Sequence, residues 1–332
     1  MRLSLGEAER LLAAAFAGAG VPGAVAASVA RALVAADAEG QSGHGFSRVA
    51  DYVAQVRSGK VRAGAGIAVT RSATTVATVD AGYGFAYPAL DRATALAAEI
   101  AQEHGSAVVA VARSHHCGAL SVQVDRIARA GCLGIMVANA PAAIAPWGAK
   151  TPLYGTNPIA FAAPRPDGST FVADLSLSRV ARGKVMNARK TGQPIPADWA
   201  LDRDGAPTTD PEAALAGSML PIGGAKGTVL ALMVEILAAV LPGASLSREA
   251  SSFFDAEGPP PGTGQTLIAI RPPDPAAFGA RLERLFALLL AEEGARLPGA
   301  RRDATRAEAE RDGLVLSEPY LTQIRRLAGV GD

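Results

Sequence analysis

The sequence contains little cysteine, lysine or aromatic side chain, and it has no long unbroken apolar run. Two cysteines, Cys117 and Cys132, are too few for a disulfide framework and indicate a reducing compartment, so we expect a cytoplasmic protein. The longest apolar stretch, residues 227–241, is interrupted by Glu235 and is shorter than the roughly 20 residues of a membrane-spanning helix. We interpret it as a buried helix. The first residues include acidic side chains and no apolar core, which argues against a signal peptide.

Net charge is also scarce. The formal net charge of +1 leaves no electrostatic footprint for nucleic acid or for an anionic membrane. Hydrophobic residues make up 49% of the 332 residues, which is a globular composition, and the chain is longer than one hydrophobic core usually serves. We therefore expect more than one lobe. The five lysines are Lys60, Lys150, Lys184, Lys190 and Lys226.

The hydrophobic pattern predicts a mixture of helices and strands. A capping box of Ser4 and Glu7 opens the first helix, because each side chain can bond the other's backbone N–H. Alternation over residues 67–80 predicts a β-hairpin. Further helices are expected at residues 24–37, 88–103, 121–130, 227–241, 278–293 and from 301 onward, and another is expected to follow His44 and end at about residue 58. Further strands are expected at residues 108–112, 135–138, 161–163, 171–174 and 266–270.

Gly18, Gly20 and Gly23 match the G-x-G-x-x-G pattern of dinucleotide-binding proteins literally. That pattern binds a pyrophosphate only where a strand precedes it and a helix opens from it, so that free N–H groups meet the phosphate. Here a charged helix precedes the glycines, and Pro22 lacks an N–H. We predict a helix–helix turn, so a dinucleotide would not be bound by a Rossmann βαβ unit.

His44 lies between two glycines at a predicted helix start, where the backbone can approach a ligand and an imidazole can titrate near neutral pH. Arg48 follows four residues later, so both side chains would point to one side of one helix. A guanidinium that binds a carboxylate, one turn from a proton donor, suits a 2-oxo acid. The alternative is a helix cap with an ordinary surface His–Arg pair.

His115, His116 and Cys117 follow the apolar strand 108–112 directly. Adjacent side chains do not converge easily on one ion, and no further ligand lies at metal-binding spacing, so we expect no metal. A turn that presents imidazole and backbone N–H groups to a ligand is favoured instead. The fourth histidine, His104, ends a predicted helix and is expected at the surface.

Two segments could bind phosphate. Residues 223–227 (Gly-Gly-Ala-Lys-Gly) open the apolar helix and combine backbone N–H groups, a helix N-terminus and the Lys226 ammonium. Arg301 and Arg302 follow a Pro-Gly turn and are the second candidate, with a solvated basic pair as the alternative.

Taken together, the motifs resemble the type-2 malate/L-lactate dehydrogenase family. That family also contains sulfolactate and ureidoglycolate dehydrogenases, diketogulonate reductase and Δ1-piperideine/Δ1-pyrroline-2-carboxylate reductase. The similar segments run in one order along nearly the whole chain. They are residues 42–48, 116–120, 139–148, 153–158, 174–178, 181–184, 192–202, 207–211 and 220–227.

The resemblance implies a non-Rossmann α/β fold with a mostly antiparallel central sheet in the nicotinamide-binding lobe, and a helical lobe built from both chain ends. Residues 1–115 with 295–332 would then carry the catalytic histidine and the dimer contacts. Residues 116–294 would bind NADH or NADPH, without a metal. The implied partners are a small carboxylate substrate and a second copy of the chain, with no nucleic acid and no membrane.

The family resemblance also assigns roles. His44 would be the proton donor, and Arg48 and Thr156 would bind the substrate carboxylate, while the nicotinamide delivers hydride to C2. The cofactor contacts would be His116, Cys117, Gly118, Ala119, Leu120, Asp174, Leu175, Ser176, Arg182, Gly183, Lys184, Ala225, Lys226, Arg301 and Arg302.

Departures from the family pattern bear on the substrate. Gly43 stands where many members have serine, so a serine–histidine relay cannot operate. Lys184 matches most alcohol-forming members, whereas the imine reductases of the family often have aspartate at this position. The imine reductases nevertheless share the His-His pair of this chain. Ala225 stands where the family has a histidine. We expect a reductase of 2-oxo acids of the malate, lactate or sulfolactate type. The alternatives are a cyclic imino acid reductase and a catalytically silent ligand-binding homologue.

Overall fold

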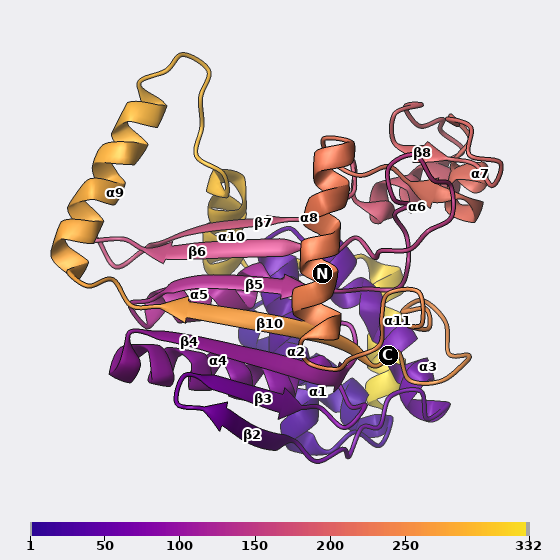
Figure 1. The fold of residues 1–332 in the computed structure, drawn as a ribbon. Helices are drawn as coiled ribbons and strands as arrows, with labels where there is room; N and C mark the ends of the chain where they lie inside the picture. The colour runs from indigo at the N-terminus through magenta and orange to yellow at the C-terminus, as the bar shows by residue number, and fades with distance from the viewer. Residues whose placement is uncertain (1, 330–332) are drawn as a thin grey trace.

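A seven-stranded sheet organises the computed structural model, which describes residues 2–329 (Figure 1). The strand order is β2-β3-β4-β10-β5-β6-β7, and every neighbouring pair is antiparallel except β3 and β4. The predicted α/β fold with a mostly antiparallel sheet is therefore confirmed. The strands are β2 (Ala68–Ala73), β3 (Val76–Asp80), β4 (Ser106–Ser114), β5 (Leu133–Ala138), β6 (Ile159–Pro164), β7 (Thr170–Leu175) and β10 (Thr263–Ile270).

Strand β10 comes from far along the chain and lies between β4 and β5. Leu267 pairs with Val109 on one side and with Met136 on the other. All three side chains are fully buried, as expected for a central strand that is covered by helices. The sheet therefore takes strands from both sides of the boundary expected at residue 115.

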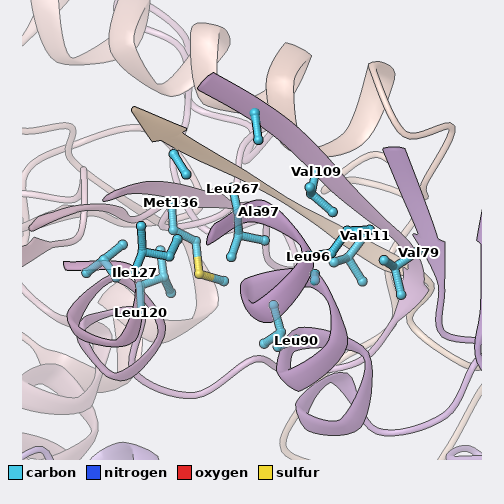
Figure 2. Packing of buried hydrophobic residues seen from close by; sticks show 14 of the residues in the cluster. Val79, Leu90, Leu96, Ala97, Val109, Val111, Leu120, Ile127, Met136 and Leu267 are labelled. Atoms are coloured by element: carbon cyan, nitrogen blue, oxygen red, sulfur yellow. The ribbon is translucent and has the colours of Figure 1, made fainter. Parts of the chain in front are cut away.

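Helices α4 (Ala86–His104) and α5 (Ser121–Arg129) cover one face of the sheet. Leu96 and Ala97 of α4 point at Val109 and Leu267 of the sheet (Figure 2). Full burial of one such aliphatic side chain stabilises the fold by about 1.5–3 kcal/mol. The same packing fixes the end of β4, from which residues 115–120 continue into the candidate site.

A second hydrophobic core joins the two ends of the chain. It contains α1 (Leu5–Gly18), α2 (Gly23–Ala38), α3 (Val49–Arg57) and α11 (Glu318–Ala328), and the short strands β1 (Arg2–Leu3) and β11 (Leu314–Val315) pair beside it. The Ser4–Glu7 capping box is present. The glycine-rich segment after α1 is the predicted helix–helix turn, and a Cβ on Gly18 would reach 2.6 Å from the backbone oxygen of Leu327.

The remaining elements lie around the sheet (Figure 1). They are α6 (Arg182–Thr191), β8 (Ala200–Leu201), α7 (Pro211–Ala216), β9 (Ser218–Met219), α8 (Ala225–Glu235), α9 (Pro275–Leu290) and α10 (Ala300–Asp312). Helix α9 projects away from the sheet at its far end (Figure 1). Within residues 2–329, the helices are too short or too polar to cross a membrane.

The prediction of a buried helix at residues 227–241 is wrong. Helix α8 continues as a π-helical segment, η3 (Ile236–Val240), and only one side of this rod packs on the body of the protein. Val229 is 57% exposed and Val240 is 59% exposed. The segment is apolar on all sides because its outer side carries an exposed aliphatic surface. Periodicity alone cannot distinguish such a helix from one that is buried on all sides.

Candidate active site

His44 lies on a tight double turn between α2 and α3. Two 3₁₀ turns, η1 (Ser42–His44) and η2 (Phe46–Arg48), meet at Gly45. His44 and Arg48 are therefore not on one helix, and that prediction is wrong. The backbone N–H of Phe46 donates to the Asp37 carboxylate, which breaks the helical hydrogen-bond pattern at this point.

The His44 ring begins a chain of four hydrogen-bonded side chains. His44 Nδ1 lies 3.2 Å from Nε2 of His116, and Nδ1 of His116 lies 2.5 Å from the Tyr52 hydroxyl. The Tyr52 hydroxyl lies 2.9 Å from that of Tyr87. Tyr52 comes from α3, Tyr87 from α4 and His116 from the segment after β4, so the chain ties three elements together behind His44.

Burial and the nearby Arg48 guanidinium lower the pKa of His44 to about 4. Burial also lowers the pKa of His115 to about 3 and moves that of His116 well below its usual range. The expectation that His44 titrates near neutral pH is therefore wrong, because a cation beside a desolvated imidazole disfavours its charged form. All three rings are neutral at pH 7.

The Arg48 side chain is buried beside this chain of groups. Its Nη2 donates to the backbone oxygen of Phe253 at 2.6 Å, and its Nη1 pairs with Asp51 at 3.1 Å. The guanidinium stacks 4.6 Å from the centre of the Phe254 ring. Its Nε–H has no partner among residues 2–329. A buried donor without an acceptor is unfavourable, so this group is suited to an anionic ligand.

His115 sits in an aromatic enclosure next to this site. Its ring contacts those of Tyr52, Phe85 and Phe253, and neither of its nitrogens has a partner among the described residues. Cys117 is buried, and burial raises the pKa of its thiol to about 12, so it behaves as a small hydrophobic side chain. Cys117 and Cys132 are both free thiols.

A second polar cluster gathers several of the predicted cofactor residues around Ser121. The Ser121 N–H donates to Asp174 at 2.9 Å, and its hydroxyl donates to the buried Glu39 carboxylate at 2.6 Å. Burial raises the pKa of Asp174 to about 6. Arg302 lies 3.8 Å from Glu39, which brings α10 to the same place, whereas Arg301 is exposed.

The N-terminus of α8 has the features of an anion site. Gly223 and Gly224 both have φ of +62°, a conformation that favours glycine, and no side chain caps the helix. A Cβ on Gly227 would overlap the backbone oxygen of Ile222, so the turn is tight. Lys226 is exposed beside these N–H groups. This geometry fits a phosphate group of a nicotinamide dinucleotide.

Thr156 belongs to a turn that is fixed from α8. Its neighbour Asn157 adopts φ of +39°, and the Asn157 side-chain amide donates a hydrogen bond of 2.8 Å to the buried carboxylate of Glu235. Glu235 also accepts from the backbone and hydroxyl of Ser247, both at 2.6 Å. The residue that interrupts the apolar run therefore anchors the Thr156 turn. No hydrogen bond or ion pair within residues 2–329 joins Thr156 to His44.

The other predicted cofactor residues form no hydrogen bond or ion pair with His44 within residues 2–329. Gly183 and Lys184 line a cavity of about 440 Å³ beside α6, together with Trp199. Burial lowers the pKa of Arg182, Leu175 is 45% exposed, and Ser176 bonds Ser178. Over the described part of the chain, no three His, Cys, Asp or Glu side chains are grouped as metal ligands. Residues 118–120 link the His116 and Ser121 groups.

Sequence reasoning missed the residues that support the site. Tyr52, Tyr87, Asp37 and Glu39 belong to no recognisable motif, because each is a single residue within or just after a helix of mixed composition. The spacing of Tyr52, one helical turn beyond Arg48, was the available signal.

The comparisons with known proteins agree with this geometry. Residues 3–325 match the family described as malate/L-lactate dehydrogenase. The chain is 50% identical over 330 residues to the (2R)-3-sulfolactate dehydrogenase (NADP(+)) of Chromohalobacter salexigens, covering 98% of each chain. It is 38% identical to the Δ1-pyrroline-2-carboxylate reductase of Ancylobacter novellus, covering 100% of this chain and 98% of that one.

A solved structure shows the same fold. The Δ1-piperideine-2-carboxylate reductase of Pseudomonas syringae superposes with a TM-score of 0.93 at 37% identity, covering 98% of this chain and 99% of that chain. The chain belongs to the malate/L-lactate dehydrogenase family and is an NAD(P)-dependent dehydrogenase or reductase.

Proposed function

We propose that this protein reduces a small 2-oxo carboxylate to the 2-hydroxy acid, with His44 as the proton donor. The observation that carries the proposal is the pairing of His44, held at Nδ1 by His116, with a buried Arg48 whose Nε–H is unpaired. A carboxylate on Arg48 would place the neighbouring carbonyl oxygen within reach of the imidazole, because the two carbons are adjacent.

Each residue has a separate task in this proposal. Arg48 and Thr156 bind the carboxylate, and His44 protonates the oxygen at C2. NADH or NADPH, when bound, supplies the hydride. The α8 N-terminus with Lys226 would hold a phosphate, and the segment from His116 to Leu120, the Asp174 cluster, residues 182–184 and Arg301–Arg302 would bind the rest of the dinucleotide.

The sulfolactate dehydrogenase at 50% identity favours a substrate of the malate, lactate or sulfolactate type, and NADPH as the reductant. A cyclic imino acid is the second candidate, because relatives at 37–40% identity are Δ1-pyrroline- or Δ1-piperideine-2-carboxylate reductases. His44 would then protonate nitrogen in place of oxygen.

We further propose a cytoplasmic homodimer. The exposed aliphatic side of α8 and η3, with Met233 at 52% and Ile236 at 47% exposure, is the kind of surface that a second copy covers. Residues 1–115 with 295–332 would carry the catalytic histidine and residues 116–294 most cofactor contacts. Light scattering after size exclusion tests the assembly; a monomer at micromolar concentration would contradict it.

One kinetic panel tests the activity. Purified protein is assayed with NADH and NADPH against pyruvate, oxaloacetate, sulfopyruvate and Δ1-pyrroline-2-carboxylate, and kcat/KM values are compared. A preference for the 2-oxo acids supports the proposal, and a preference for the imine establishes the second candidate. Cofactor oxidation with none of them would contradict both.

A further inference from the structure

The hydrogen bonds behind His44 join four groups in a row. From the substrate side they are His44, His116, Tyr52 and Tyr87, with successive heavy-atom distances of 3.2, 2.5 and 2.9 Å. Each link holds one proton, because each joins one donor to one acceptor. Since every inner group has a partner on both sides, the direction of one bond decides the direction of all the others.

If all four groups are neutral and Tyr52 donates one bond and accepts the other, only two arrangements of these protons are possible. A Tyr52 that accepted both bonds would leave its own buried proton without an acceptor. In the first, Tyr87 donates to Tyr52, Tyr52 to His116 Nδ1, and His116 Nε2–H to His44 Nδ1, which leaves the remaining His44 proton on Nε2. In the second, all three bonds reverse, and His44 Nε2 carries no proton. Only the first arrangement can protonate a substrate from His44.

Tyr87 favours the first arrangement. Its side chain is buried, and within residues 2–329 its hydroxyl has no hydrogen-bond partner except Tyr52. A Cβ on Gly118 would come within 2.8 Å of that hydroxyl, so the main chain closes the space around it. If Tyr52 donated to Tyr87, the Tyr87 proton would be buried without an acceptor, which is unfavourable.

We propose that Tyr52, acting through His116, is a positioning residue that holds neutral His44 with its Nε2–H toward the substrate and supplies the proton that replaces the one given up. The inference rests on the proposed function, because it takes His44 as the proton donor. Tyr87 sets the direction of these hydrogen bonds.

Hydride addition leaves an alkoxide, and the Nε2–H bond of His44 breaks as the substrate O–H bond forms. His116 then gives its Nε2 proton to His44 Nδ1, and Tyr52 gives its hydroxyl proton to His116 Nδ1. The charge that remains is a phenolate on Tyr52, a weaker base than the alkoxide it replaces. Water returns the proton when the product has left.

The charges around the chain fit this role. Burial raises the pKa of Tyr52 to about 12, and the Arg48 guanidinium, 5.6 Å from the centre of the Tyr52 ring, opposes that shift and would stabilise a phenolate there. His115 packs edge-on against the Tyr52 ring, and Cys117 is buried nearby; both are neutral at pH 7. Burial and Arg48 disfavour an imidazolium on His44. A neutral His44 that donates its Nε2 proton and receives another at Nδ1 from His116 can protonate the substrate without that charged form.

The test compares Tyr52→Phe, Tyr87→Phe and His44→Gln with wild type, and Tyr320→Phe serves as a control that removes one exposed phenol hydroxyl from α11. We expect Tyr52→Phe to lower kcat by about tenfold or more, up to the roughly 10²–10⁴-fold that general acid catalysis contributes, with little change in either KM. Rates in mixtures of H₂O and D₂O should curve for wild type, as several protons move, and become linear in Tyr52→Phe.

A second measurement does not depend on turnover. Nitrogen-15 NMR of histidine-labelled protein at pH 7 should show His44 and His116 as neutral Nε2–H tautomers in wild type, and a mixture in Tyr52→Phe and Tyr87→Phe. An Nδ1–H tautomer of His44 in wild type would overturn the inference.

The outcomes separate the two proposals. If His44→Gln loses activity while Tyr52→Phe keeps the wild-type rate and a linear isotope plot, the inference fails and the proposed function stands. If His44→Gln keeps the wild-type rate, the proposed role of His44 fails, and with it the relay. Melting curves identify a variant that does not fold, and Tyr87→Phe then tests the inference with Tyr52 intact.

Discussion

The carboxylate of Asp37 occupies the space in which any side chain on Gly45 would lie. Asp37 ends α2 and binds the N–H of Phe46, so it joins that helix to the turn that carries His44. The backbone beside the proposed proton donor is therefore fixed by the absence of a side chain at one position and the presence of a carboxylate at another.

Gly45→Ala should displace this turn. The new Cβ would overlap the Asp37 carboxylate, so we expect a loss of about 1–3 kcal/mol in the free energy of unfolding, as for other overpacked sites, together with a lower kcat. Gly43→Ala is the matched control, since a Cβ on Gly43 meets nothing within 4 Å. Gly43→Ser should be tolerated as well. Equal urea denaturation midpoints for Gly45→Ala and Gly43→Ala would disprove the overlap.

Asp37 should make stability fall as the pH rises. Burial raises the pKa of this carboxyl to about 6, above its usual value, so the folded state disfavours ionisation. Its stabilising contribution is complete at about pH 4 and is lost as the pH rises through 6. Asp37→Asn keeps an acceptor for Phe46 and should melt at least about 2 °C above wild type at pH 7 but not at pH 4. Asp204→Asn, in an exposed loop, is the control; a uniform shift at both pH values would contradict the explanation.

Loss of the His44 imidazole should lower the reduction rate without a change in cofactor affinity. We expect His44→Gln to reduce kcat by about 10²–10⁴-fold. Since the pKa of His44 is lowered to about 4, wild-type kcat should show no titration of His44 between about pH 6 and 8. A wild-type rate that falls with a midpoint near the usual histidine value would show that the imidazolium donates the proton.

Arg48→Lys should weaken the enzyme although the charge is kept. The planar guanidinium contacts Phe253, Asp51 and the Phe254 ring at once, and a lysine ammonium cannot reproduce that geometry. We expect kcat/KM for the carboxylate substrate to fall by about 10²-fold, with the loss of one bidentate charged pair. Arg57→Lys, at the end of α3, controls for the exchange itself. Unchanged kinetics would remove Arg48 from the site.

Lys226→Ala should raise the KM for the cofactor and leave the KM for the carboxylate unchanged. A lysine at a helix N-terminus contributes to binding mainly through its charge, so we expect a rise of about tenfold, and more for NADPH if the lysine binds its extra phosphate. Lys150→Ala is the control for loss of a lysine.

NADH and NADPH should also raise the melting temperature of the wild type, since they bind only the folded state. No thermal shift with either would contradict the cofactor site.

The sequence was sufficient to predict most helices and strands and to single out His44 and Arg48, but not how the elements meet. Periodicity predicted the strands at residues 108–112 and 266–270, because their apolar residues cluster locally. It could not show that Leu267 lies between Val109 and Met136, since strand pairing leaves no trace in either segment alone. For the same reason the glycines around His44 and the nearby Arg48 drew attention to these two residues, whereas no motif in the sequence pointed to Tyr52 and Tyr87.

The exposure of α8 had a different cause. An aliphatic side chain that is exposed and one that faces the core are the same residue type in the sequence. Val229 and Val234 of α8 illustrate the point, with 57% and 1% of their surfaces exposed.

The place of β10 in the sheet has a consequence for synthesis of the protein. Strands β4 and β5 follow each other within 33 residues of chain, from Ser106 to Ala138, yet neither meets its inner partner until residues 263–270 have left the ribosome. Until then the growing chain holds two half-sheets with open edges, β2-β3-β4 and β5-β6-β7, which are the kind of edge that recruits other chains. The last quarter of the protein thus closes its centre, and a nascent chain truncated before Thr263 is the form most exposed to aggregation.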